Sequence, residues 1–123
     1  MLFWENLYTG VTVVTPRGYD HGDLVVRYGS SCDEWALRYD LQVLETYHMD
    51  GIVTMQAVAI NGNDMDIMAN YTIIDYGDND TILYCVMHDN MCIGWYHNCI
   101  EYRKAILNHV IDTYINPCYI VIE

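Results

Sequence analysis

The sequence predicts an α+β domain in which an antiparallel or mixed β-sheet carries two α-helices packed on one face. β-branched and aromatic runs are divided by turns rich in Gly, Asn and Asp, and two segments carry apolar residues at the spacing of a helix. The strands follow one another closely enough to pair as hairpins, which favours this class over a parallel α/β fold. The expected order is ββαβββαβ within one domain, residues 1–123.

Residues 11–14 and 24–28 are predicted to be the first two strands. Both runs are β-branched or aromatic, and the loop between them contains Pro16 and two glycines, which favour turns. The run at 119–122 has the same character and is expected to add a last strand.

Residues 31–48 are predicted to form the first helix, ending before Gly51. Ser31 followed by Glu34 matches a capping box, a pattern that satisfies free backbone N–H groups at a helix N-terminus. Apolar or aromatic side chains then recur at helical spacing: Leu37, Leu41, Leu44 and His48.

An antiparallel meander is predicted next, with strands at residues 52–60, 65–75 and 81–87. The turns between these strands lie at Asn61-Gly62-Asn63 and at 77–80, and Asn-Gly is among the strongest short-range hairpin signals. The meander therefore supplies the centre of the predicted sheet.

The second helix is predicted over residues 99–114, ahead of Asn116-Pro117. Asn98 and Glu101 repeat the capping pattern. An apolar stripe follows at Ile100, Leu107, Ile111 and Tyr114.

Net charge is the most informative chemical property of the chain. Seventeen Asp and Glu against five Lys and Arg give a formal charge of −12, which exceeds the magnitude of about 2–8 that keeps a small domain soluble. Between Arg38 and Arg103 there is no Lys or Arg, although this segment carries many acids. A direct nucleic-acid binder needs a basic stripe, so the charge excludes that class and favours a basic protein as partner.

The candidate partner-binding residues are aspartates of this cation-free segment: Asp64, Asp66, Asp75, Asp78, Asp80 and Asp89. In a strand, Asp64 and Asp66 share one face about 6.6–6.8 Å apart, where they repel each other without any benefit to folding. A basic partner would remove that repulsion on binding, as cations neutralise the phosphates of nucleic acid. The alternative is an ordinary solvated face whose aspartates stabilise turns.

Metal binding is a second alternative function for these residues. Asp75, Asp78 and Asp80 could chelate Ca²⁺ or Mg²⁺, but the EF-hand pattern is absent. Possible zinc ligands are Cys85, His88, Cys92, His97 and Cys99. Their spacing lacks paired C-x₂₋₄-C motifs, and strand alternation would send the first two to opposite faces. We therefore expect no metal and no cofactor.

An enzyme is not expected. The nearest acid–base cluster is Asp20, His21 and Asp23, and it is more simply a polar turn. The chain has no nucleophile elbow, Walker loop, HExxH motif or dinucleotide fingerprint, so no residue is assigned as catalytic.

The expected location is the cytoplasm, that of a bacterial host if the chain is phage-encoded. An odd number of irregularly spaced cysteines (Cys32, Cys85, Cys92, Cys99 and Cys118) predicts free thiols in a reducing compartment. No apolar run approaches the roughly 20 residues that span a bilayer, so no membrane partner is expected.

In size, acidity and lack of catalytic motifs, the chain resembles phage-encoded anti-defence proteins, including anti-CRISPR proteins and DNA mimics. The likeness is one of general character and no single motif carries it. It implies a non-enzymatic inhibitor that presents carboxylates to the basic nucleic-acid-binding surface of a bacterial nuclease or effector complex. The alternatives are an intracellular protein–protein interaction domain that uses an apolar patch and a small metal-dependent enzyme.

Overall fold

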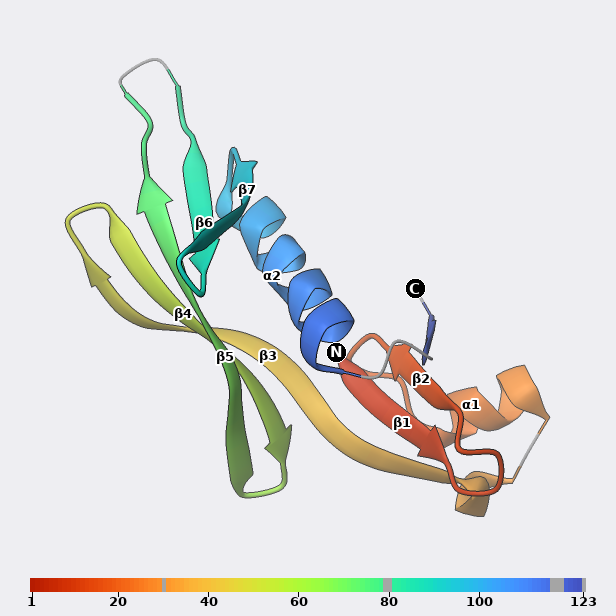
Figure 1. Ribbon diagram of the computed structural model, residues 1–123. Coiled ribbons are helices and arrows are strands. Elements are labelled where there is room, and N and C mark those ends of the chain that lie inside the picture. The colour runs from red at the N-terminus through yellow and green to blue at the C-terminus, as the bar shows by residue number, and fades with distance from the viewer. Residues whose placement is uncertain (30, 79–80, 116–118, 123) are drawn as a thin grey trace.

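The computed structural model describes residues 1–29, 31–78, 81–115 and 119–122. Within them, one eight-stranded sheet has the order β7-β6-β5-β4-β3-β1-β2-β8 (Figure 1). The strands are β1 (Leu2–Asn6), β2 (Thr12–Thr15), β3 (Trp35–Met49), β4 (Ile52–Asn61), β5 (Asp64–Asp75), β6 (Tyr84–His88), β7 (Met91–Tyr96) and β8 (Tyr119–Val121). The helices are α1 (His21–Tyr28), α2 (Cys99–Tyr114) and the short 3₁₀ helix η1 (Cys32–Glu34).

Neighbouring strands of this sheet are antiparallel except β2 and β8, which are parallel. The α+β class and the mostly antiparallel sheet are therefore confirmed. The meander predicted over 52–87 is present as β4, β5 and β6, and α2 occupies the predicted residues 99–114. The last strand was also predicted, whereas β1 and β7 were missed.

The helix predicted over residues 31–48 is wrong, because most of this segment is the long strand β3. The capping pattern at Ser31 yields only the single turn of η1, and the Ser31 side chain makes no capping hydrogen bond. Tyr39, Leu41 and Val43 alternate toward the main core with the period of a strand. Leu37 and Leu44, which supported the helical stripe, are exposed. Burial of these alternating residues in the core therefore outweighed the local helical pattern, and the segment forms a strand.

The strand predicted at 24–28 is also wrong, since these residues belong to helix α1. Asp20 and Asp23 form the capping box of α1: the Asp20 side chain accepts from the Asp23 backbone N–H, and the Asp23 side chain accepts from that of Asp20. Gly29 ends the helix in the left-handed region at φ 67°, a conformation that glycine adopts without steric cost. The capping box and Gly29, which mark the beginning and the end of the helix, therefore lie on either side of the β-branched run.

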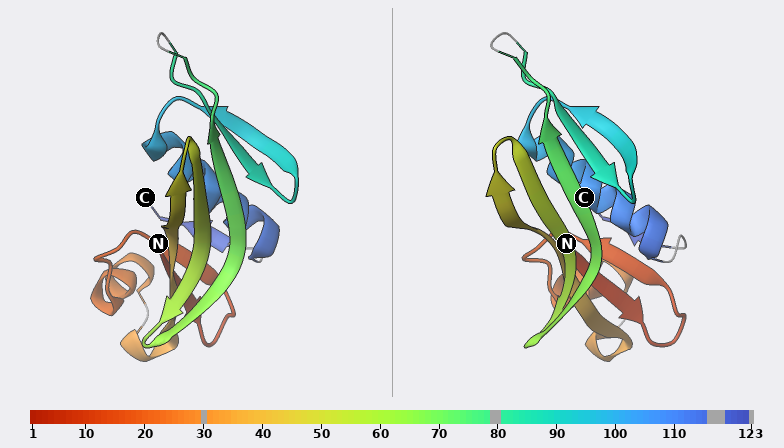
Figure 2. Two further views of the ribbon diagram at one scale, coloured as in Figure 1. Left: turned by 90° about the vertical axis from the view of Figure 1, so that its left-hand side faces the viewer. Right: turned by 60° about the vertical axis from the view of Figure 1, so that its left-hand side comes forward.

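The two helices pack against opposite faces of the sheet rather than on one face. Adjacent residues of β1 and β2 point to opposite sides: Phe3 and Val14 join the core beneath α2, whereas Trp4 and Val13 pack with Leu24 of α1. The views in Figure 2 show α1 and α2 on the two sides of β1 and β2. The larger core lies between α2 and strands β3, β4 and β5.

The buried face of α2 carries much of this core, so its central side chain should be costly to truncate. Ile106 is 0% exposed and Ile100, on the same helix, is 76% exposed. We expect Ile106→Ala to lower the free energy of unfolding by about 2–5 kcal/mol, because it removes buried methyl groups and leaves a cavity. Ile100→Ala should change it by about 0.5 kcal/mol or less. Urea denaturation of both variants is the measurement, and equal losses would contradict the assigned face.

Candidate partner-binding surface

Three segments meet at the end of the sheet far from β1 and β2. They are the β3–β4 turn, the segment that follows β5, and the beginning of α2 (Figure 1). Backbone hydrogen bonds join the first two, from Asp75 N to Gly51 O at 2.9 Å, and close the base of the β5–β6 connection, from Tyr76 N to Leu83 O at 2.9 Å. We call this surface the acidic end, defined by its exposed carboxylates Glu45, Asp50, Asp75, Asp78 and Glu101.

The structure separates the six predicted binding aspartates into three places. Asp75 and Asp78 lie on the acidic end, while Asp64 and Asp66 are exposed where β5 begins. The two pairs thus lie at opposite ends of one strand, roughly 30 Å apart at about 3.3 Å per residue. Asp89 lies in the β6–β7 turn, and Asp80 lies outside the described residues.

The aspartates of the acidic end also stabilise their own loop. Asp75 Oδ1 accepts a hydrogen bond from Gly77 N at 2.8 Å, and Asp78 Oδ1 accepts one from Thr81 N at 2.9 Å. Each bond satisfies a backbone donor in the manner of an Asx turn. Both carboxylates nevertheless stay exposed, so turn chemistry and partner binding are compatible at these positions.

The basic side chains are gathered mainly at the other end of the molecule. Arg17 donates to Asp40 at 2.8 Å and Arg38 donates to Glu5 at 3.0 Å. Arg27 lies in the last turn of α1. The same end also carries Glu5, Asp20, Asp23, Asp33, Glu34 and Asp40, so it is acidic as well, although two of its carboxylates are paired with arginines.

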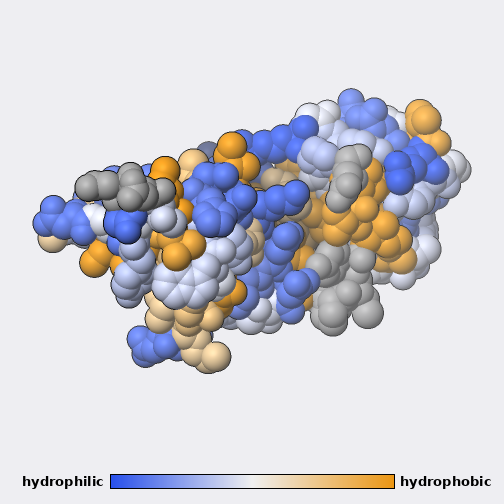
Figure 3. Space-filling view, turned by 90° about the horizontal axis from the view of Figure 1, so that it is seen from above, coloured by the Kyte–Doolittle hydropathy of each residue, from blue (hydrophilic) through white to orange (hydrophobic). Residues whose placement is uncertain are grey.

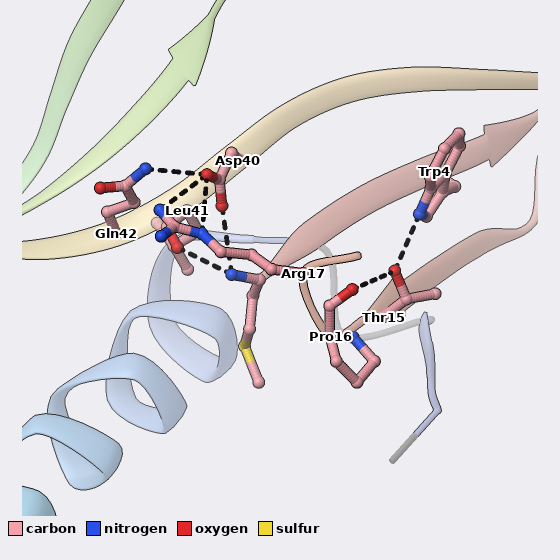
Figure 4. A network of polar contacts seen from close by, with 8 residues as sticks. Trp4, Thr15, Pro16, Arg17, Asp40, Leu41 and Gln42 are labelled. Atoms are coloured by element: carbon pink, nitrogen blue, oxygen red, sulfur yellow. Dashed lines mark hydrogen bonds and ion pairs between the residues drawn. The ribbon is translucent and has the colours of Figure 1, made fainter. Parts of the chain in front are cut away.

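Asp40 is the centre of a polar network between β3 and the N-terminal strands (Figure 4). Burial opposes ionisation of Asp40, but hydrogen bonds from Gln42, Arg17 and the Met1 ammonium outweigh it and lower its pKa. The Met1 ammonium lies 3.2 Å from Asp40 Oδ1 and also donates to Leu41 O. This carboxylate is thus partly buried and joins β3 to the N-terminal residues, whereas those of the acidic end are exposed.

Exposed aromatic and aliphatic side chains accompany the carboxylates of the acidic end. The rings of Tyr76 and Trp95 lie 5.4 Å apart and are 60% and 52% exposed. Ile82 and Met49 are exposed on the same group of segments. Figure 3 shows small hydrophobic areas scattered among hydrophilic ones at its left-hand end. Apolar anchors within a charged rim are the usual anatomy of a protein interface.

Four of the five possible zinc ligands at 85–99 make hydrogen bonds within the protein: Cys85, His88, Cys92 and His97. Cys85 and Cys92 have their sulfur atoms 3.0 Å apart, and burial followed by the contact with Cys92 raises the pKa of the Cys85 thiol to about 11. His88 hydrogen-bonds to Asn70 O and to the Tyr114 hydroxyl through its two ring nitrogens. Among the described residues, no group of three or more His, Cys, Asp or Glu is arranged to hold a metal ion.

The cluster Asp20, His21 and Asp23 is structural in its contacts. The two aspartates cap α1, and His21 Nε2 hydrogen-bonds to Trp35 O at 3.1 Å. The His21 ring also packs edge-on against Trp4 at 4.9 Å. These contacts attach the start of α1 to β1 and β3.

A second histidine cluster, which the sequence did not reveal, joins α2 to the sheet. The Tyr71 ring stacks on His88 at 4.6 Å, and its hydroxyl shares a 2.7 Å hydrogen bond with His109 Nδ1. Burial, followed by the effects of Tyr114 and Asp89, raises the pKa of Tyr71. Burial and the neighbouring His88 lower the pKa of His109. Because the partners come from β5, β6 and α2, no local motif could indicate them.

Zinc is not expected to contribute to stability. Since the nitrogens of His88 are engaged and Cys85 contacts Cys92, a zinc ion would have to break existing hydrogen bonds. We expect EDTA to leave the melting temperature unchanged and elemental analysis to find no stoichiometric zinc. One retained equivalent, with a lower melting temperature in EDTA, would contradict this, because structural zinc contributes to folding.

Mild acid should destabilise the protein through His109. A lowered pKa in the folded state means that the unfolded chain takes up a proton first as pH falls through about 6.5. The contribution of His109 is therefore complete above that pH and is lost below it. Urea denaturation between about pH 7.5 and 5.5 should give a smaller pH dependence for His109→Asn than for the parent. An unchanged slope would exclude His109 as a source.

Comparisons with known proteins identify no relative from which a function of this surface could be inferred. Among the described residues, none of the helices has the length and apolar character to cross a bilayer. No protein-family model, curated protein or solved structure matches this chain.

Proposed function

We propose that this chain is a non-enzymatic acidic binding protein that occupies the basic nucleic-acid-binding surface of a bacterial nuclease or effector complex, as phage-type anti-defence inhibitors do. The observation that carries the proposal is the gathering of exposed carboxylates at the acidic end. Exposed carboxylates surround an aromatic pair at one end, while Arg17, Arg27 and Arg38 lie at the other. A basic groove that binds phosphates offers the matching charge.

The negative charge of the acidic end affects both the approach to a basic partner and the docking. Like charges at one end repel one another, and a cationic groove relieves that repulsion as it binds. The negative charge gathered at the acidic end also attracts a basic surface during approach, so association should be fast at low ionic strength. Tyr76 and Trp95 supply the apolar contact that charge alone does not, since aromatic side chains dominate interface energetics.

A protein–protein interaction domain that binds mainly through apolar contacts is the second candidate. It is favoured by the exposed Tyr76, Ile82 and Trp95 and by a broader hydrophobic area away from the acidic end in Figure 3. Salt separates the two candidates, because charge-driven binding weakens as salt rises while apolar binding does not.

Two double variants with the same charge change test the proposal. Asp75→Asn with Asp78→Asn removes two charges from the acidic end, and Asp64→Asn with Asp66→Asn removes two from the opposite end of β5. Inhibition of DNA cleavage is measured for a panel of purified bacterial nucleases, RNA-guided effectors and restriction enzymes. The first variant should bind its target at least roughly tenfold more weakly at low salt, and the second should remain within about threefold.

Thermal melts control for folding in this experiment. Asparagine keeps the side-chain oxygen that accepts from Gly77 and Thr81, so the acidic-end variant should melt no lower than the parent. Inhibition that is unchanged in that variant, binding that is indifferent to salt, or no binding to any nuclease of the panel at low salt would refute the proposal.

A further inference from the structure

A small cavity opens at the acidic end between the β3–β4 turn, β5 and α2. Its volume is about 280 Å³, slightly below the roughly 300–1,000 Å³ of sites for drug-sized ligands. Val53 and Ile73 provide apolar lining, Tyr84 and Tyr102 provide aromatic lining, and the carboxylates of Glu45 and Asp75 also line the space. The size suits a single long side chain rather than a metabolite.

The Tyr102 hydroxyl is the most informative group in this cavity. Tyr102 is 7% exposed, and its hydroxyl has no hydrogen-bond partner within the part of the chain that the structure describes. No fully buried polar side-chain atom among those residues lacks a partner, so this hydroxyl must reach an open space. Tyr102 is among the residues that line the cavity, and we infer that its hydroxyl faces this space. A buried phenol thus presents a free donor and acceptor to whatever enters.

The charges around the cavity favour a cation. Burial, followed by smaller effects of Cys99, Tyr84 and Glu45, raises the pKa of Tyr102, while Arg103 acts in the opposite direction. Asp75 uses Oδ1 to accept from Gly77, which leaves Oδ2 available. His48 lies 3.5 Å from Glu45. Arg103 reduces the negative potential in part. Its guanidinium donates a hydrogen bond to Val43 O at 3.0 Å.

The shape and chemistry distinguish a guanidinium from an ammonium group. The rings of Tyr84 and Tyr102 meet edge-to-face, 5.4 Å apart at 72°, and such aromatic faces attract a planar cation. A guanidinium has five donors in a fixed fork for carboxylate and phenol oxygens, whereas an ammonium is compact and strongly hydrated. The aliphatic stem of an arginine would lie against Val53 and Ile73.

We propose that this cavity binds the guanidinium group of one arginine side chain from the basic partner. The source of the arginine rests on the proposed function, while the recognition of a guanidinium rests on the cavity itself. Glu45 and Asp75 bind the charge, Tyr102 accepts one N–H, and the tyrosine rings orient the plane. The acidic end thereby recognises the shape of one side chain in addition to its charge.

The test uses blocked amino acids as probes and NMR spectra of the full chain. N-acetyl-arginine methylamide should shift the ring signals of Tyr84 and Tyr102 and the amide signals of Gly51 and Asp75, saturating at roughly 1–50 mM. N-acetyl-citrulline methylamide has a similar shape without the charge and should not bind. The blocked lysine should bind several-fold more weakly. Equal shifts with arginine and citrulline would overturn the proposal.

Variants identify the groups responsible. Glu45→Gln combined with Asp75→Asn should abolish saturable binding of blocked arginine, and Tyr102→Phe should weaken it by about tenfold, the loss expected for a hydrogen bond to a charged group. The matched control, Asp64→Asn with Asp66→Asn, should bind like the parent. Binding that persists in the Glu45 and Asp75 variant, with a spectrum otherwise that of the folded parent, would overturn the assignment.

These outcomes are independent of the nuclease experiment. Salt-dependent inhibition without binding of blocked arginine would refute the cavity and leave the proposed function. Specific binding of blocked arginine without inhibition of any nuclease would refute the function and leave the guanidinium site.

Discussion

The junction at Asp40 holds the two parts of the sheet together. This residue pairs with Leu2 of β1 on one side and with Ile60 of β4 on the other, so both ladders pass through one position of β3. Its carboxylate also binds Arg17, Gln42 and the Met1 ammonium (Figure 4). Because β3 serves both ladders, the N-terminal strands and the meander are parts of a single sheet. The acidic end is consequently held at a fixed distance from the N-terminal strands.

Sequence patterns predicted the elements whose signals are local and failed where packing decides. The meander and α2 were found because Asn-Gly and the cap at Asn98 act within a few residues. β3 was missed because Leu37, Leu41 and Leu44 match a helical period by coincidence, while burial selects Tyr39, Leu41 and Val43. In α1 the capping box Asp20–Asp23 and Gly29 were available signals that the β-branched run between them obscured.

The candidate surface was predictable in composition but not in placement. The absence of Lys and Arg between Arg38 and Arg103 indicated an acidic surface, and Asp75 and Asp78 are on it. The sequence could not show that Asp64 and Asp66 would lie at the far end of β5, because that depends on the length of the strand. It also gave no sign that Glu45 and Tyr102 would meet at the cavity, which they reach from β3 and α2. Residues so far apart in the chain share no spacing that a motif would record.

The parallel pairing of β2 with β8 has a consequence for the order of folding. It joins Thr12 to Tyr119, so roughly 100 residues of chain must already be arranged before this ladder can form. The hairpins β3–β4, β4–β5 and β6–β7 close over short loops and need no such arrangement. Much of the acidic end is built from β3, β4 and β5, so we expect it to form before β8 closes the sheet. A nascent chain therefore acquires its charged surface before the edge beside β2 is covered.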